Sequence, residues 1–136
     1  MTGGVLQSEV TREGDGMVVA LVGEMDLSTC PVAGSLFDSI DWGSLSQLTV
    51  DLRGIEFMDS TGLHLLLGVR DAARSRGVSL ALIAGSDAVR RVFKLTGTDS
   101  QFTWVDGVIP TVRRRRSLAA RRRRSAVFSP TGVSSI

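Results

Sequence analysis

The sequence has only one cysteine and one histidine among its 136 residues, too few for a disulfide framework or a zinc-type ligand set. Cys30 has no second cysteine to pair with in the chain, so a reducing, cytoplasmic compartment is expected. No segment approaches the roughly 18 uninterrupted apolar residues of a membrane-spanning helix, and residues 1–16 lack a basic start followed by a long apolar run. Membrane spanning and secretion are therefore disfavoured, and neither a metal nor another cofactor is expected.

Acidic side chains are absent beyond residue 112, which makes the charge of the chain uneven. All 14 Asp and Glu residues lie before residue 113 with only 8 of the 16 Lys and Arg residues, so residues 1–112 carry a net charge of minus six. The other eight basic residues form two runs of four arginines, at residues 113–116 and 121–124. An acidic core repels a phosphate backbone, so no direct nucleic acid contact by the core is expected.

Length and an apolar content of 43% predict one compact domain, residues 1–111, followed by a tail, residues 112–136. The arginine runs and the polar, turn-like residues after them predict disorder and a solvated, nonspecific basic extension. Contact of the tail with nucleic acid, anionic lipid or an acidic partner stays open, as does a second kinase target at its serines.

The apolar pattern predicts strands that alternate with helices after an initial hairpin. Strands are expected at residues 5–11 and 17–22 around a turn at residues 14–16, and then at 48–52, 78–84 and, as a short last strand, 102–105. Strand, helix, strand order predicts parallel crossovers. The expected fold class is therefore α/β.

Three amphipathic helices are expected between these strands. Thr29 and Pro31 predict the start of the first helix, Gly77 the end of the second, and Ser86 with Asp87 the start of a third that Gly97 ends. The apolar residues at helical spacing, expected to form the inner faces, are Val32, Leu36, Phe37 and Ile40, then Leu63, Leu66, Leu67 and Ala73, and then Val89, Val92, Phe93 and Leu95.

The strand before the second helix runs into the segment Asp59-Ser60-Thr61-Gly62, which places a hydroxyl at a helix start. A helix start carries unpaired N–H groups and the positive end of the helix dipole, so an anion attached at Ser60 is tolerated there. The ordinary alternative is that Ser60 simply caps the helix. The two roles are compatible.

Two motifs make the chain similar to STAS domains of the anti-sigma factor antagonist type, over roughly residues 4–110. They are Gly23-Glu-Met-Asp-Leu-Ser-Thr29 and the segment from Asp51-Leu to Phe57-Met-Asp-Ser-Thr-Gly-Leu63, each leading into a helix. The resemblance implies a mixed β-sheet of four to five strands with about four helices packed mainly on one side. It also implies a binding protein that has no catalytic activity.

The resemblance further implies a switch that regulates transcription. A kinase-type anti-sigma factor, a serine kinase, binds the unmodified protein, and phosphorylation of Ser60 releases the antagonist and frees the anti-sigma factor to hold its sigma factor. A metal-dependent serine phosphatase then resets the switch. Partner contact is expected at Asp26, Asp59, Thr61 and Gly62.

Each acidic candidate also has a structural interpretation. Asp26 serves either as a turn-forming or capping carboxylate or as a partner contact. Asp59 either positions Ser60 for the kinase or orients the turn, and Asp51 is equally well explained as a paired structural carboxylate.

The other candidates near Ser60 have similar alternatives. Thr61 is a weaker second phosphate acceptor, and Gly62 permits close approach of either a partner or a neighbouring element. His64 is expected to be an exposed or hydrogen-bonded side chain rather than a general base.

Two other functional classes remain as alternatives. An accessory subunit of a membrane lipid transporter shares the fold and binds an ATPase subunit, and its basic tail then meets anionic lipid. A small enzyme that uses Ser60 as a transient phosphoryl carrier is disfavoured, because the sequence has no phosphate-cradling loop and no base beside the serine.

Overall fold

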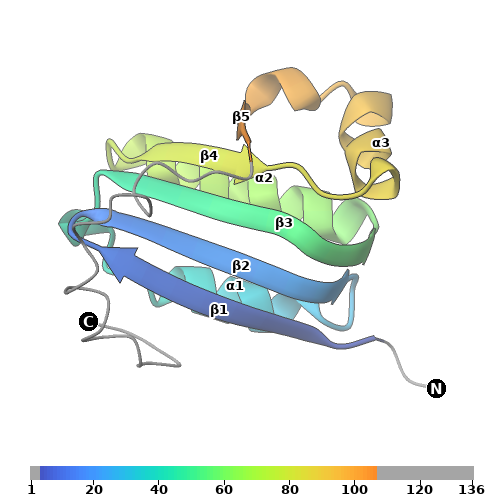
Figure 1. Ribbon diagram of the computed structural model, residues 1–136, viewed down its shortest axis with the longest axis horizontal. Helices are drawn as coiled ribbons and strands as arrows, with labels where there is room; N and C mark the ends of the chain where they lie inside the picture. The colour runs from blue at the N-terminus through green and yellow to red at the C-terminus, as the bar shows by residue number, and fades with distance from the viewer. Residues whose placement is uncertain (1–3, 107–136) are drawn as a thin grey trace.

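The computed structural model describes residues 4–106, which contain one five-stranded sheet whose spatial order follows the order in the chain (Figure 1). The antiparallel pair β1–β2 is a hairpin, and all other neighbouring strands are parallel. The predicted hairpin, parallel crossovers and short last strand are confirmed. The predicted tail, residues 112–136, and its boundary lie outside the described residues. The strands are β1 (Leu6–Glu13), β2 (Gly16–Met25), β3 (Gln47–Met58), β4 (Ser79–Ile83) and β5 (Thr103–Val105).

Each pair of neighbouring parallel strands is connected through one α-helix. Right-handed crossovers between strands that advance in one direction place successive helices on the same face of the sheet, and Figure 1 shows α1 and α2 together behind it. The expected mixed sheet is confirmed, with three α-helices in residues 4–106 instead of about four. The helices are α1 (Cys30–Asp38), α2 (Ser60–Ser75) and α3 (Asp87–Thr96), and two short 3₁₀ helices are η1 (Trp42–Ser44) and η2 (Asp99–Gln101).

One hydrophobic core lies between the sheet and the helices. Alternate residues of the central strands point into it, since side chains of a strand alternate between its two faces. The α2 residue Leu66 and the α3 residue Phe93 meet them there. Sheet residues almost fully removed from solvent in this layer are Val19, Leu21, Leu48, Val50, Leu52 and Leu82.

The predicted helix ends at α2 and α3 are confirmed by their capping geometry. The hydroxyl of Ser86 accepts a hydrogen bond from the Val89 N–H at 3.3 Å at the start of α3. Gly97 follows α3 with φ of 74°, and Gly77 follows α2 with φ of 72°. This left-handed conformation is one that glycine adopts without steric cost.

Two expected inner residues are instead exposed. Val32 is 64% exposed and Leu95 is 78% exposed. In α1 the inward face consists of Cys30, Ala33 and Phe37, so the helix is rotated relative to the predicted apolar stripe. The spacing of apolar residues did not distinguish the predicted stripe, which contains Val32, from the observed one, which contains Cys30 and Ala33.

Strand β3 is longer than its predicted span of residues 48–52. It continues to Met58, and its pairing with β2 shifts register between Ala20 and Val22 and again between Gly23 and Glu24. These irregularities change which residues face the core, so Ile55 and Met58 are buried in this second half of β3. In the part of the chain that the structure describes, no helix is long and apolar enough to cross a membrane.

Candidate functional site

The two sequence motifs meet where the parallel strands β2 and β3 end. Met25 and Met58 are register partners at the ends of the two strands, and each is followed directly by an aspartate, Asp26 or Asp59. The backbone N–H of Asp59 donates to the Met25 carbonyl at 3.1 Å. This hydrogen bond fixes the loop after β2 against the start of α2, so the two motifs form one surface region.

Asp59 caps α2. One of its carboxylate oxygens, Oδ1, accepts a hydrogen bond from the Thr61 N–H at 2.8 Å, and its backbone is extended at the helix boundary. A carboxylate in this position satisfies an unpaired N–H of the first turn and lies at the positive end of the helix dipole. Asp59 therefore orients the turn, which is one of the two roles predicted for it.

Ser60 is the first residue of α2, and it is exposed. The capping bond to the first turn comes from Asp59, and within residues 4–106 no hydrogen bond holds the Ser60 hydroxyl. The simple capping role is thus filled by its neighbour. The Ser60 hydroxyl is exposed in the first turn of α2, where the helix N-terminus favours an added anion.

Gly62 is buried, and its packing explains why the residue is a glycine. A Cβ atom at this position would lie 2.8 Å from Met58 Cγ and 2.9 Å from Met25 Cβ, closer than real Cβ atoms approach. The neighbouring elements β2 and β3 therefore approach α2 closely here, which is one of the two predicted explanations. Contact of Gly62 with a partner stays a prediction, and His64, two residues further along α2, is exposed.

Asp26 organises the loop that precedes α1. Its Oδ1 accepts hydrogen bonds from the Ser28 hydroxyl at 2.7 Å, the Ser28 N–H at 2.9 Å and the Thr29 N–H at 3.1 Å. The Ser28 hydroxyl is the largest influence on the pKa of Asp26, and together with the backbone donors it lowers that pKa against the opposing effect of burial. The predicted turn-forming role is confirmed.

Cys30 lies close enough to both Asp26 and Asp59 to feel their charges. Burial raises the pKa of Cys30, and the charges of Asp59 and Asp26 raise it further. A buried thiol beside two carboxylates stays protonated and is a poor nucleophile. The site therefore has an acidic surface and no reactive cysteine.

Asp51 is a paired structural carboxylate. Both of its oxygens accept from the Arg53 guanidinium, at 3.0 Å from Nε and 2.8 Å from Nη2. Burial alone raises the pKa of Asp51, but the hydrogen bonds and charge of Arg53 outweigh burial and lower it. Asp51 is thus accounted for by its own strand and takes no part in the site at the strand ends.

Two contributors to this region were not predicted. The Thr29 hydroxyl accepts from the Asp26 N–H at 3.0 Å and donates to the Glu24 carbonyl at 2.7 Å, so it holds the loop closed. The Asp-x-Ser-Thr spacing is a signal that was available for this turn. Leu27, at the tip of the loop, is 76% exposed, and no sequence pattern distinguishes it from a core leucine.

The arrangement can present a modifiable hydroxyl and a shaped acidic surface. Within residues 4–106, no three His, Cys, Asp or Glu residues gather into a group that could hold a metal ion.

Comparison with known proteins agrees with this geometry. The model of the STAS domain family matches residues 7–114. An anti-sigma-B factor antagonist of Staphylococcus aureus is 29% identical over 92 residues, which cover 68% of this chain and 85% of that protein. One from Listeria monocytogenes is 31% identical over 86 residues, which cover 63% and 75%. The crystal structure of an anti-sigma factor antagonist from Mycobacterium paratuberculosis superposes with a TM-score of 0.68 at 26% identity, covering 86% of this chain and 94% of that one.

Proposed function

The chain belongs to the STAS domain family, and on this premise we propose that it is an anti-sigma factor antagonist switched by phosphorylation of Ser60. In its unmodified form it binds a kinase-type anti-sigma factor in the cytoplasm, and phosphorylation by that kinase releases it. A metal-dependent serine phosphatase restores binding. The names of its relatives support the antagonist role. Residues 1–111 are proposed as the domain that performs it, and residues 112–136 as a tail.

The observation that carries the proposal is that Asp59, and not Ser60, caps α2. Asp59 supplies the capping hydrogen bond to Thr61 at 2.8 Å, so Ser60 is not needed to start α2. A phosphate on Ser60 therefore leaves the helix intact, and the helix N-terminus partly offsets its local cost. The modification is then free to act on docking alone.

The charge of the surroundings explains how a phosphate disrupts docking. It adds about 1.5 to 2 negative charges next to Asp59 and close to Asp26. A partner that buries this region must then remove the water from a phosphate beside two carboxylates, which is costly and repulsive. Each loss of about 1.4 kcal/mol in binding free energy weakens the affinity tenfold.

The same region exposes apolar side chains that suit a protein partner. Leu27 is 76% exposed directly after Asp26, and Val32 is 64% exposed in the first turn of α1. An apolar centre with a polar rim is the usual composition of a protein interface, in which a few anchors carry most of the binding free energy. We assign partner contact to this surface, together with the predicted contacts Thr61 and Gly62.

A pull-down from native cell lysate tests the proposal, with the full chain as bait and mass spectrometry to identify bound proteins. Ser60→Ala is expected to retain a kinase that Ser60→Asp loses. Ser75→Asp is the matched control, because it adds the same charge at an exposed serine at the other end of α2. It is expected to retain the kinase.

Two results would contradict the switch. If Ser60→Asp and Ser75→Asp lose the kinase equally, the effect is one of net charge and Ser60 has no special place. If both Ser60 variants retain the ATPase subunit of a membrane lipid transporter and no kinase is retained, the accessory-subunit alternative replaces the antagonist.

A further inference from the structure

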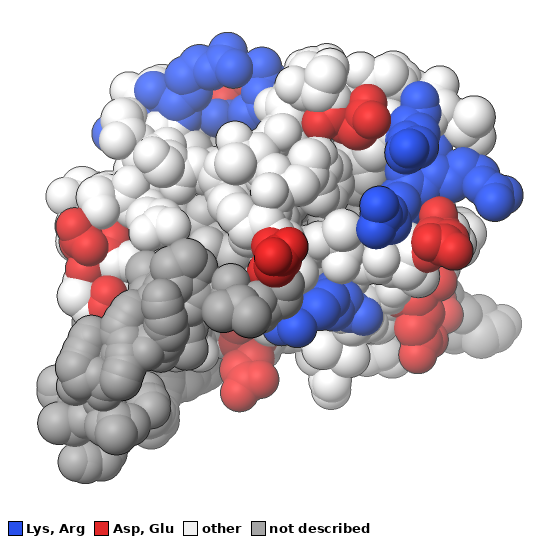
Figure 2. Space-filling model, turned by 45° about the horizontal axis from the view of Figure 1, so that its top comes forward, with Lys and Arg blue, Asp and Glu red and all other residues white. Residues whose placement is uncertain are grey.

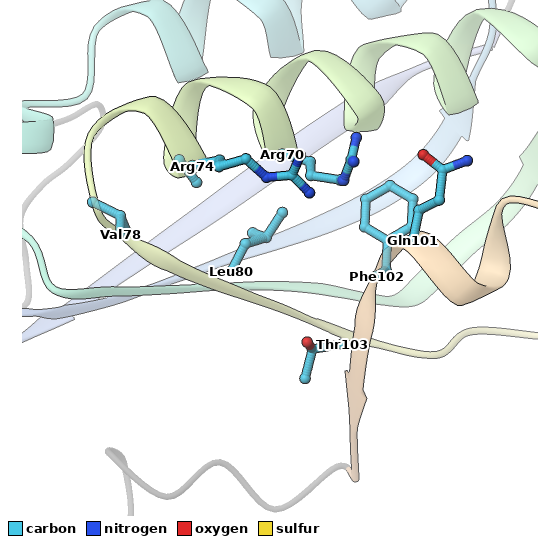
Figure 3. A pocket seen from close by; sticks show the side chains of 8 residues that line it. Arg70, Arg74, Val78, Leu80, Gln101, Phe102 and Thr103 are labelled. Atoms are coloured by element: carbon cyan, nitrogen blue, oxygen red, sulfur yellow. The ribbon is translucent and has the colours of Figure 1, made fainter.

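A second candidate site lies at the opposite end of α2 from Ser60. A cavity of about 210 Å³ is lined by the last turns of α2, by β4 and by the segment that joins η2 to β5. Figure 3 shows Arg70 and Arg74 extending from α2 over Leu80, with Phe102 and Gln101 on the other side. At 1.5 Å of rise per residue, this cavity is on the order of 15 to 20 Å along the helix from Ser60.

Arg70 is a half-buried cation at this cavity. Its side chain is 18% exposed, and within the described residues its ion pairing is a single 3.2 Å contact from Nη1 to Asp71, whose own side chain is 71% exposed. Its Nε atom is fully buried and has no hydrogen-bond partner among the described residues. A buried N–H without an acceptor is destabilising, and because Nε is closed to solvent, a ligand reaches Arg70 through the exposed part of its side chain.

Arg74 adds a second charge to the same cavity. Within the described part of the chain it has no carboxylate within ion-pair distance, and it lies four residues after Arg70 on the same face of α2. Like charges at this spacing repel each other on a helix face. Figure 2 shows basic side chains gathered at the upper left, over the end of α2, with little acidic surface among them.

The charge balance favours an anion even though the cavity is near a helix C-terminus. The C-terminal carbonyls carry about half a negative charge, whereas Arg70 and Arg74 together carry two positive charges. Guanidinium groups donate paired N–H bonds that match the geometry of phosphate and carboxylate oxygens. Gln101 and Thr103, which also line the cavity, supply further polar groups.

The remaining walls are apolar, and the volume limits the ligand. Leu80, Val78 and Phe102 form a surface that a bare inorganic ion cannot use. Pockets for drug-sized ligands measure roughly 300 to 1,000 Å³, so a cavity of about 210 Å³ is too small for a nucleotide. It suits a charged head group with one ring or a short chain.

We propose that this cavity binds a small organic anion, a phosphate monoester or a carboxylate, between Arg70 and Arg74. The charged group bonds to accessible N–H groups of the two guanidinium groups, and its apolar part lies against Leu80 and Phe102. The site uses no residue of the Ser60 region. This proposal can therefore fail without affecting the proposed phosphoswitch, and the phosphoswitch can fail without affecting this proposal.

The test is a titration of the full chain followed by NMR, which observes the Arg70 Nε–H and the backbone N–H groups directly. Phenyl phosphate is expected to cause saturable shifts confined to residues that line the cavity, among them Arg70, Arg74, Leu80 and Phe102. Arg74→Gln is expected to raise the dissociation constant of phenyl phosphate about tenfold, because one charge-assisted pair of hydrogen bonds is lost. Arg90→Gln is the matched control, because it removes the same charge from an exposed position on α3.

Three results would overturn the proposal. The first is that Arg74→Gln and Arg90→Gln weaken the affinity for phenyl phosphate equally. The second is that the shifts never saturate and spread over all exposed arginines. The third is that inorganic phosphate and phenyl phosphate bind with equal affinity. A parallel titration with benzoate, which carries a carboxylate in place of the phosphate, identifies the preferred charged group. The anion with the lower dissociation constant carries the group that the site prefers. Ser60→Ala is expected to leave every titration unchanged.

Discussion

The two glycines inside α2 should respond in opposite ways to the same substitution, which tests the packing at the candidate site. Gly62 is buried at the junction of α2 with β2 and β3, whereas Gly68 has no other atom within 4 Å of the position that an added Cβ would take. Replacing either by alanine removes the same backbone entropy from the unfolded chain. Only the surroundings of the new methyl group differ.

The expected magnitudes follow from two opposing terms. Gly→Ala inside a helix stabilises it by up to about 1 kcal/mol. At Gly62 the new Cβ meets Met25 Cβ at 2.9 Å and Met58 Cγ at 2.8 Å. Met58 can change rotamer, but Met25 Cβ is attached to the backbone of β2 and cannot turn away. Overpacking of this kind costs about 1 to 3 kcal/mol, so we expect Gly62→Ala to destabilise the protein.

The assay is urea unfolding, with the free energy of unfolding compared among the three proteins. Gly68→Ala should be more stable than the wild type by a few tenths to about 1 kcal/mol, and Gly62→Ala less stable by roughly 0.5 to 2 kcal/mol after the helix gain is subtracted. If both substitutions stabilise equally, α2 does not approach β2 as closely as described, and the geometry given for the Ser60 region is wrong.

Three further predictions concern single residues. Asp51→Asn should cost about 1 kcal/mol at pH 7. Because folding lowers the pKa of Asp51, the difference from wild type should begin to shrink below the usual aspartate value of about 3.9 and vanish only below the lower folded pKa; urea unfolding at pH 7 and at pH 3 should show a smaller difference at pH 3. Phe93→Ala removes a ring that stacks edge-on with Phe102 and Trp104 at 5.5 Å and 5.0 Å, and thermal unfolding should show a loss of about 3 to 5 kcal/mol. Leu27→Ser should leave stability within about 0.5 kcal/mol yet reduce kinase retention in the pull-down, and unchanged retention would remove Leu27 from the docking surface.

Local signals in the sequence were enough for much of the fold. Gly14, Gly77 and Gly97 mark a turn and two helix ends by backbone conformations that few other residues adopt, so these boundaries were predicted. The apolar runs of β2 and β4 likewise indicated buried strands. Such features depend on a few consecutive residues, and the rest of the fold does not change their meaning.

Features that depend on tertiary context could not be predicted in this way. The extension of β3 to Met58 depends on irregular pairing with β2, and the rotation of α1 that exposes Val32 depends on how Phe37 fits the core. At the site, the position of Ser60 was predictable. That Asp59 and not Ser60 caps α2 depends on hydrogen-bond geometry, which the sequence does not give. The cavity at Arg70 joins three elements distant in the chain and leaves no local pattern.

The most direct test of the central claim is the affinity of the captured kinase for the protein in its unmodified and Ser60-phosphorylated forms, measured by isothermal titration calorimetry. The switch predicts that phosphorylation weakens binding at least a hundredfold, which corresponds to about 2.7 kcal/mol. Far-ultraviolet circular dichroism should show the same helix content in both forms, because Asp59 still caps α2. Affinities equal within about twofold would contradict the claim that Ser60 controls docking.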